Sequence, residues 1–352
     1  MIRYAIIGTG WRSGFYVRLA GLCPDRFQLG CIYTRSPEKA ESLRRETGLH
    51  YTSELNEIFE GSYDFVTVAI KRGFCREYVD ALIKRDIPVL CETPPAESFE
   101  DLQSVYRDWK GARIQFVEQY FAQPLYATWL RAVRGGQLGR VESVNLSCIH
   151  GYHAASMIRL FLGTGMERFS IDACSTEEHV IETKSRAGEI LGGDMLSYDR
   201  VRAMISFESG KTAFYDFSGP QYQSFLRQRH LNIRGDRGEI DDMLLEKLNS
   251  DGVPVTLNLD RYDLGRYDNK FHGLSRLTAG EQVLYDNPFK YYPLNDDEIA
   301  LASILELMKK YVDTGESFYS LEETLQDTYI SLAVDAALLN KGRFNSEPQP
   351  WN

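Results

Sequence analysis

The chain has 352 residues, of which 26% are charged and 43% hydrophobic, the balance of an ordinary globular protein. Its formal net charge of −10 gives no global basic field, so we expect neither nucleic acid nor a membrane surface as a partner. No run approaches the roughly 18 apolar residues of a membrane span, and the length favours two domains.

Cysteine usage and the start of the chain bear on the cellular compartment. The six cysteines form no CxxC pair, and several lie in apolar runs that resemble strands. We therefore expect reduced core cysteines rather than a disulfide framework or metal ligands. The N-terminus leads straight into an apolar run without a signal peptide, so we expect a cytoplasmic protein with no metal site.

The first 40 residues predict a nucleotide-binding turn. The order is strand, glycine turn, helix and strand, over Arg3–Ile7, Gly8-Thr9-Gly10, Trp11–Cys23 and Phe27–Tyr33. Glycines let the backbone approach a pyrophosphate, and a helix N-terminus offers unpaired N–H groups to it. Ser13 stands where the G-x-G-x-x-G pattern has its third glycine, and a plain tight turn is the alternative reading.

The alternation of strands and helices continues, with Ser36 as the expected N-cap of the next helix and Pro37 at its first position. The expected elements are helix Pro37–Glu46, strand Tyr63–Ile70, helix Cys75–Arg85, strand Ile87–Cys91, helix Phe99–Trp109 and strand Ile114–Glu118. Repeated βα units predict a parallel, doubly wound Rossmann sheet in an α/β domain over residues 1–122. Its ligand should lie at the C-terminal ends of the strands.

Those strand ends supply the candidate cofactor-binding residues. The end of the second strand carries no carboxylate to bind a ribose 2′-hydroxyl, whereas Thr34 and Ser36 can hydrogen-bond a phosphate and Arg35 can clamp it. This favours NADP over NAD, with an exposed arginine on a turn as the alternative. The full set is Gly8, Thr9, Gly10, Trp11, Arg12, Thr34, Arg35, Ser36, Lys39, Ile70, Lys71, Glu92 and Thr93.

Beyond residue 122 the pattern becomes that of a second domain, over residues 123–352, with largely antiparallel strands. We expect helices at Pro124–Arg134, Ala154–Leu162, Asp296–Asp313 and Leu321–Leu339, and strands at Arg140–Ile149, Ala203–Phe207, Thr212–Phe217, His230–Gly235 and Glu239–Leu244. Residues 251–294 receive no assignment. The polar tail Phe344–Asn352 is expected to be loose.

The predicted strand Thr212–Phe217 carries apolar residues at both odd and even positions, among them Ala213, Phe214, Tyr215 and Phe217. A sheet covered by helices on one face would leave some of these side chains exposed. Large exposed apolar patches usually mark interfaces, so we expect a homodimer or homotetramer formed through this sheet.

A histidine pair near the start of a predicted helix is the candidate catalytic group. His150 and His153 lie three residues apart, with Tyr152 between them. An imidazole suits acid–base chemistry near neutral pH, and the alternative is a pair of capping or core histidines. Gln119 and Tyr120, after the last strand of the first domain, could border a substrate.

Four spaced motifs resemble the Gfo/Idh/MocA family of oxidoreductases. They are IIGTGW at the start, PVLCETP at 88–94, GGQLGRVESV at 135–144 and HLNIRGDRGEI at 230–240. The resemblance extends over nearly the whole chain. It implies a Rossmann domain followed by a domain with a large, mostly antiparallel open sheet, an NAD(P) cofactor and a carbohydrate-like small-molecule substrate.

The chain departs from the catalytic part of the family pattern. Glu92-Thr93-Pro94 stands where the family usually has Glu-Lys-Pro, whose lysine helps to move a proton. In the family's Asp-x-x-x-His-x-x-Asp pattern only His153 matches, because Ile149 and Ser156 replace the two aspartates. The resemblance implies that Glu92 is mainly a positioning residue.

Three functions remain open. The first is an NAD(P)-dependent oxidoreductase that acts on a sugar, a sugar acid or a related polyhydroxylated compound by hydride transfer. The second is a redox-assisted glycosidase or lyase with tightly bound cofactor. The third is a non-catalytic NAD(P)-binding sensor, and the missing lysine adds weight to the last two.

Overall fold

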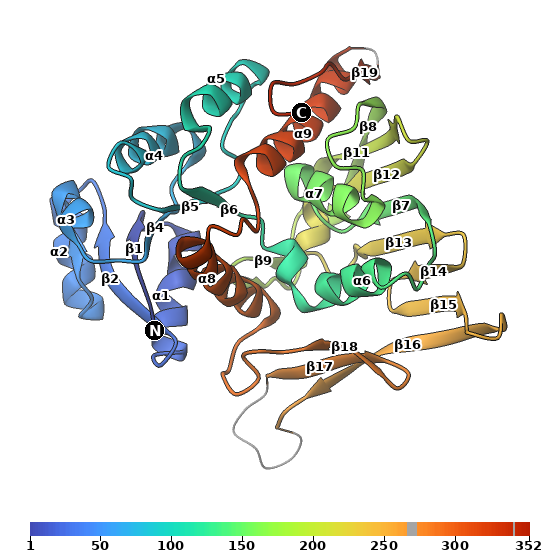
Figure 1. Ribbon diagram of the computed structural model, residues 1–352, viewed down its shortest axis with the longest axis horizontal. Helices are drawn as coiled ribbons and strands as arrows, with labels where there is room; N and C mark the ends of the chain where they lie inside the picture. Colours follow the sequence, from blue (N-terminus) through green and yellow to red (C-terminus); the bar gives the residue numbers. More distant parts are fainter. Residues whose placement is uncertain (266–272, 341) are drawn as a thin grey trace.

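The computed structural model describes residues 1–265, 273–340 and 342–352. Two sheets dominate it: a six-stranded sheet in the N-terminal third, and an eleven-stranded sheet built from the rest of the chain (Figure 1). Among the described helices, none is long and apolar enough to cross a membrane.

The first sheet is a Rossmann sheet, with strand order β3-β2-β1-β4-β5-β6 and every neighbouring pair parallel. This confirms the parallel, doubly wound sheet expected from the sequence. Its elements are β1 (Ile2–Ile7), α1 (Trp11–Leu22), β2 (Phe27–Tyr33), α2 (Pro37–Thr47), β3 (Tyr51–Thr52), α3 (Leu55–Glu60), β4 (Phe65–Val68), η1 (Arg72–Phe74), α4 (Cys75–Ile83), β5 (Val89–Glu92), α5 (Phe99–Trp109), β6 (Ile114–Val117) and η2 (Tyr120–Ala122).

The second sheet has the order β18-β17-β16-β15-β14-β13-β7-β12-β11-β8-β19, and it is antiparallel except where β12 pairs with β7. A separate hairpin joins β9 to β10. The elements are α6 (Pro124–Arg134), β7 (Val141–Ser147), α7 (Gly151–Leu162), β8 (Phe169–Ile181), β9 (Lys184–Ser185), β10 (Gly188–Glu189), β11 (Met195–Phe207), β12 (Thr212–Phe217), η3 (Gly219–Tyr222), β13 (His230–Gly235), β14 (Gly238–Asp241), β15 (Leu244–Leu248), β16 (Pro254–Asp263), β17 (Leu274–Ala279), β18 (Gln282–Asp286), α8 (Asp296–Thr314), α9 (Leu321–Leu339) and β19 (Arg343–Asn345).

Helix α8 joins the two halves of the molecule. It packs against α1, β1, β4 and β6 of the first sheet and against α6 of the second half, and it lies between the two sheets in Figure 1. Asn295 caps it by accepting a hydrogen bond from the Glu298 N–H, while the Glu298 carboxylate accepts from the Asn295 N–H. The N-terminus of α8 is thereby fixed beside α1.

Three expected boundaries in the second half are wrong. Helix α7 begins at Gly151 rather than Ala154, because hydroxyls of distant tyrosines accept the first backbone N–H groups. The expected strand Glu239–Leu244 is two strands, β14 and β15, because Asp242 adopts a left-handed φ of 51° and turns the chain. The expected strand Ala203–Phe207 is only the end of the 13-residue strand β11.

The C-terminal tail is ordered, contrary to expectation. Strand β19 adds to the edge of the large sheet beside β8, and the indole N–H of buried Trp351 donates to Gln326 on α9. The segment is polar in sequence, but backbone pairing and one aromatic side chain hold it. Cys174 also departs from the expected core set: it is exposed, whereas the other five free cysteines are buried.

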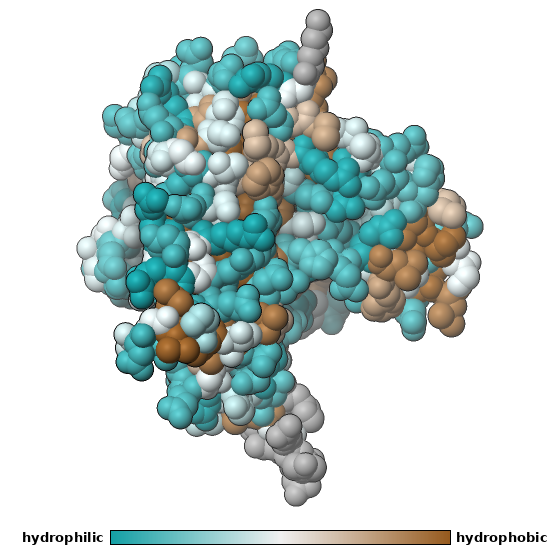
Figure 2. Space-filling view, turned by 90° about the vertical axis from the view of Figure 1, so that its right-hand side faces the viewer, coloured by the Kyte–Doolittle hydropathy of each residue, from teal (hydrophilic) through white to brown (hydrophobic). Residues whose placement is uncertain are grey.

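Helices α6, α7 and α9 pack on one face of the large sheet, and none of the described helices covers the other face. Figure 2 looks onto the side of the molecule where that sheet lies, and brown apolar patches stand out there among teal polar atoms. Met204 on β11 and Phe214 on β12 are cross-strand partners and both are exposed. Ala213, Tyr215 and Phe217 instead point into the core, so only one parity of β12 is exposed.

Candidate functional site: a nucleotide cradle and an interdomain cleft

The turn between β1 and α1 has the close backbone approach that a nucleotide site needs. Gly8 adopts a φ of 124°, and a Cβ atom there would lie 2.3 Å from the carbonyl oxygen of Ala69. Only glycine fits that position. Ser13, at the place of the third glycine, is small enough to be buried, and its hydroxyl donates to the same carbonyl over 3.2 Å. The packing expected of a dinucleotide turn is therefore present.

A cavity of about 380 Å³ opens beside this turn, at the C-terminal ends of β1, β2 and β4. It brings together eight of the predicted cofactor residues and adds three aromatic residues outside that set, Tyr33, Phe74 and Tyr78. The guanidinium carbon of Arg35 lies 4.9 Å from the Phe74 ring centre. The predicted residues that line the cavity are Gly8, Thr9, Thr34, Arg35, Ser36, Lys39, Ile70 and Lys71.

The residues of this cradle fit an NAD(P) cofactor. The helix N-terminus of α1 follows Gly10 without a side-chain cap, so its N–H groups are available to an anion. The hydroxyl of Ser36 already caps α2 by accepting the Lys39 N–H over 3.1 Å, as expected, and donates to Glu38. Arg35 and Lys39 therefore carry the positive charge beside the expected ribose position.

Arg12 points toward β5 and away from the adenosine end of the cradle. Its Nε lies 3.7 Å from Glu92, whose other carboxyl oxygen accepts the Tyr16 hydroxyl over 2.5 Å. Burial raises the pKa of the Glu92 carboxyl, and the Arg12 charge and the Tyr16 hydrogen bond oppose part of that shift. Glu92 thus joins the end of β5 to α1, which is a positioning arrangement. Trp11 is exposed, and the Arg186 guanidinium from the β9–β10 hairpin lies 4.7 Å from its ring centre.

His153 lies in the first turn of α7 and is 4% exposed. Its Nδ1 lies 2.6 Å from a carboxyl oxygen of Glu118, a fully buried residue directly after β6. Burial raises the pKa of Glu118 well above its ordinary value. The contact between Glu118 and Nδ1 fixes the orientation of the imidazole ring. The Tyr120 ring packs 4.7 Å from the imidazole.

His150 and Tyr152 complete the cluster. Tyr222, on η3, accepts the backbone N–H of His150 over 3.1 Å, and its hydroxyl lies 2.6 Å from the imidazole Nδ1. The same hydroxyl lies 3.4 Å from that of Tyr120. The Tyr152 ring packs 4.3 Å from the His153 ring. The structure therefore gathers His150, Tyr152 and His153 in one place, at the end of β6.

The positions where the chain departs from the family pattern have local partners. Thr93 donates its hydroxyl to the Val117 carbonyl over 3.1 Å, so it joins two strand ends. Ser156 is buried and accepts the Tyr319 hydroxyl over 2.7 Å, and Ile149 is buried in the core. Neither substituted aspartate position offers a carboxylate to a substrate.

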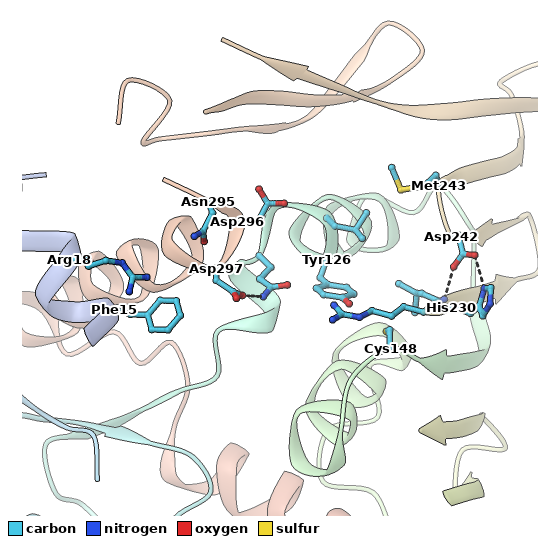
Figure 3. Close-up of a pocket in the computed structure, with 14 residues that line it drawn as sticks. Phe15, Arg18, Tyr126, Cys148, His230, Asp242, Met243, Asn295, Asp296 and Asp297 are labelled. Carbon is cyan, nitrogen blue, oxygen red and sulfur yellow. Dashed lines mark hydrogen bonds and ion pairs between the residues drawn. The ribbon is translucent and has the colours of Figure 1, made fainter. Parts of the chain in front are cut away.

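A larger cavity, of about 740 Å³, lies between the two halves of the molecule. Figure 3 shows Phe15 and Arg18 of α1 on one side of it, His230 and Asp242 on the other, and Asp297 with Tyr126 between them. The Tyr126 ring packs edge-on against Tyr120, 5.8 Å away. We call this cavity the interdomain cleft, and its Tyr126 wall adjoins the histidine cluster.

Several residues of the site were missed by the sequence reasoning. Glu118 stands at a strand end, so the rule that ligands bind at the C-terminal ends of parallel strands could have singled it out. Tyr16, Tyr222 and Asp297 lie on other elements, and no local motif marks them. They come together only through the packing of η3 and α8 against the first domain.

Comparison with known proteins shows sequence similarity between the N-terminal part of the chain and a family of oxidoreductases. Residues 2–119 match the model of the oxidoreductase family with an NAD-binding Rossmann fold, of Gfo/Idh/MocA type. A scyllo-inositol 2-dehydrogenase (NADP(+)) of Bacillus subtilis is 30% identical over 120 residues, which are 34% of this chain and 36% of the relative. A 2,7-anhydro-N-acetylneuraminate hydratase of Escherichia coli is 28% identical over 148 residues, 41% and 38% of the two chains. The chain therefore matches little more than a third of the length of these curated relatives.

Solved structures extend the likeness of the fold to nearly the whole chain. A levoglucosan dehydrogenase in complex with NADH and L-sorbose superimposes with a TM-score of 0.69 at 16% identity, covering 99% of both chains. An oxidoreductase from Agrobacterium radiobacter in complex with NAD+, L-tartaric acid and magnesium gives 0.68 at 16% identity, covering 98% of both. At these identities the likeness establishes a shared two-sheet fold.

Proposed function

We infer that residues 2–119 belong to the NAD-binding Rossmann domain of the Gfo/Idh/MocA oxidoreductase family. On this premise, we propose that the protein moves a hydride between NADP(H) and a carbinol carbon of a sugar, a sugar acid or a related polyhydroxylated compound. Residues 1–122 would hold the cofactor, and residues 123–352 the substrate and the oligomer interface. The observation that carries the proposal is the buried Glu118–His153 pair at the end of β6, in the parallel sheet whose strands β1, β2 and β4 end at the cofactor cradle.

The bound nicotinamide supplies the hydride chemistry. Gly8, Thr9 and the N-terminus of α1 would hold the pyrophosphate of the cofactor, and Arg12 and Glu92 would lie toward its nicotinamide. His153 Nε2 exchanges the hydroxyl proton of the substrate, and Glu118 holds the ring in the orientation for that transfer. Thr93 cannot do this, because an alcohol is a poor base near neutral pH and its hydroxyl is bonded to Val117. His150 and Tyr152 assist from the same cluster.

The experiment that tests the activity is a panel of inositols, aldoses and sugar acids, with NADP(H) and NAD(H), followed by absorbance of the reduced cofactor. Turnover of at least one compound, lost in His153→Ala, is the expected result. Cofactor binding with no turnover on the panel would instead indicate a sensor.

A redox-assisted glycosidase or lyase is the second candidate, because Thr93 stands in place of the usual lysine and one relative is named a hydratase. This function requires no net oxidation of substrate. Cofactor that copurifies and does not exchange, together with bond cleavage without net reduction of NADP, would favour it over the dehydrogenase.

Cofactor choice gives a separate prediction. Arg35 and Lys39 line the cradle, and neither Thr34 nor Ser36 supplies a carboxylate for a ribose 2′-hydroxyl. Arg35→Ala should weaken NADP binding by roughly 10- to 100-fold, the loss of a charge-assisted contact of about 1.5–3 kcal/mol, and leave NAD binding nearly unchanged. Dissociation constants from reduced-cofactor fluorescence measure both. Equal affinities of the parent protein for NADP and NAD would contradict the assignment.

The oligomeric state gives a further testable prediction. We propose that the open face of the large sheet, with Met204 and Phe214 exposed on it, forms a homodimer or homotetramer. Phe214→Asp should shift the protein toward monomer in light scattering at micromolar concentration, since it places a charge in an apolar contact. Leu339→Asp, on the exposed end of α9, is the matched control and should change nothing. A parent protein that is monomeric would contradict the proposal.

A further inference from the structure

Two arginines and one histidine line the interdomain cleft, and they differ in their acidic partners. Arg18 forms an ion pair with Glu298 at 2.8 Å, and the His230 Nδ1 lies 2.9 Å from Asp242. For Arg229 the described part of the chain contains no carboxylate within ion-pair distance. Among the described residues of the cleft, the positive charge of Arg229 is therefore the one that no carboxylate neutralises, so it can be balanced by solvent or by a ligand.

Arg229 is held in position although it has no ion pair. Its Nε donates to the Gln221 carbonyl over 3.1 Å, and one terminal nitrogen donates to the Tyr222 carbonyl over 3.0 Å. Its guanidinium carbon lies 5.2 Å from the Tyr222 ring centre. Because an arginine has five N–H donors in a fixed plane, these contacts orient the fork and leave the other donors for a ligand.

This arginine adjoins the proposed reaction centre. Tyr222, on which Arg229 rests, also contacts His150 and Tyr120 through its hydroxyl. A group bound by Arg229 is therefore held one residue away from the histidine cluster.

Acidic side chains line the same cleft. Asp297 accepts a hydrogen bond from the Gln123 side-chain amide, and its neighbour Asp296 forms an ion pair with Arg261 at 2.8 Å. A carboxylate such as that of Asp297 binds hydroxyl groups and repels anions. Arg229 and Asp297 would therefore orient an asymmetric ligand, with its anionic group at Arg229 and its hydroxyls at Asp297.

We propose that the cleft takes an anionic sugar, a sugar acid whose carboxylate binds Arg229. The inference rests on the proposed function and narrows its substrate class. A carboxylate and a phosphate share the chemistry that Arg229 recognises. The carboxylate is favoured because a single planar guanidinium matches it with paired hydrogen bonds, and because the helix N-terminus beside the cleft, that of α8, carries Asp296 and Asp297.

The test compares charged and neutral sugars at saturating NADP. Binding of D-gluconate and D-glucuronate, of D-glucitol and D-glucose, and of D-glucose 6-phosphate is measured by ligand-observed NMR and calorimetry. We expect at least one acid to bind roughly 10- to 100-fold tighter than its neutral counterpart. Arg229→Met should remove that advantage and Arg229→Lys should keep part of it, because methionine retains the stem on Tyr222 but not the charge.

Arg227→Met is the matched control. Arg227 lies two residues away and donates to Tyr198 and to the His179 carbonyl, and it does not line the cleft. Its loss should leave the acid preference unchanged. If D-glucose 6-phosphate binds more tightly than the sugar acids, Arg229 recognises a phosphate and the carboxylate assignment is wrong. If no acid exceeds its neutral counterpart, or if Arg229→Met keeps the advantage, the inference is wrong. NADPH fluorescence and turnover of neutral polyols separate that outcome from failure of the proposed function, since both can persist without an acid preference.

Discussion

His153→Ala is expected to lower turnover by roughly 10²- to 10⁴-fold, the usual effect of removing a general base. The structure supplies the reason. His153 is the histidine held by the buried side chain of Glu118, at the end of β6. NADP affinity should change little, because no residue that lines the nucleotide cavity belongs to α7. Steady-state kinetics on a verified substrate, with a cofactor binding curve for each variant, measures both.

Two further variants separate chemistry from structure. His153→Asn keeps a side-chain N–H that can reach Glu118 but has no second ring nitrogen, so it should fold normally and still lose turnover. Glu118→Gln replaces the titratable carboxyl group beside Nδ1 by an amide, and we expect it to lower kcat and shift the pH profile of kcat/KM, which a purely structural role would leave in place. Full turnover in His153→Ala would move the chemistry to another group in the cluster.

Much of the first domain could be predicted because its signals are local. Gly8 and Gly10 lie between a strand and a helix, and Ser36 caps α2 as expected. The alternation of apolar runs with helical segments predicts the parallel sheet that the structure shows. The cofactor residues follow from one rule, that ligands lie at the strand ends of a parallel sheet. Eight of those residues line a single cavity.

The structure of the second domain is harder to predict from the sequence, because the residues that hold its elements together are distant from one another in the chain. Strand β8 was not predicted, since its 13 residues are largely polar and are held by register with β11. The tail is ordered by pairing with β8 and by the burial of Trp351, neither of which a local pattern reveals. The turn at Asp242 depends on a left-handed backbone that glycine usually marks.

The candidate site also contains residues that a local pattern predicts and residues that only the structure brings to it. His153 was found by its place in a spaced pattern, but its partner Glu118 precedes it by 35 residues, and only the structure joins them at 2.6 Å. Arg229 and Tyr222 belong to no motif, and both lie in the segment between β12 and β13, from which Arg229 reaches the cleft. The structure also explains Ser156, which occupies the place of a family aspartate and bonds to Tyr319 inside the protein.

Arg159→Leu is expected to lower the free energy of unfolding by about 3–5 kcal/mol, the cost of breaking a buried ion pair by removing one partner. Arg159 lies on α7, two turns after His153, and its side chain and that of Asp327 on α9 are each 3% exposed. The two are 2.5 Å apart, and the guanidinium also donates to the Gly165 carbonyl over 2.8 Å and to Glu323 over 2.7 Å. Leucine would leave the Asp327 carboxylate buried without its cation.

The double variant Arg159→Leu/Asp327→Asn tests that reason. An amide at position 327 still accepts the Tyr319 hydroxyl but carries no charge, so the double variant should recover a substantial part of the loss. Glu323 needs no replacement, because its side chain is 38% exposed and water can solvate it. Denaturant unfolding followed by far-ultraviolet circular dichroism measures all three proteins. A loss below about 1 kcal/mol in Arg159→Leu, the scale of a surface pair, would show that the network does not hold α7 in place.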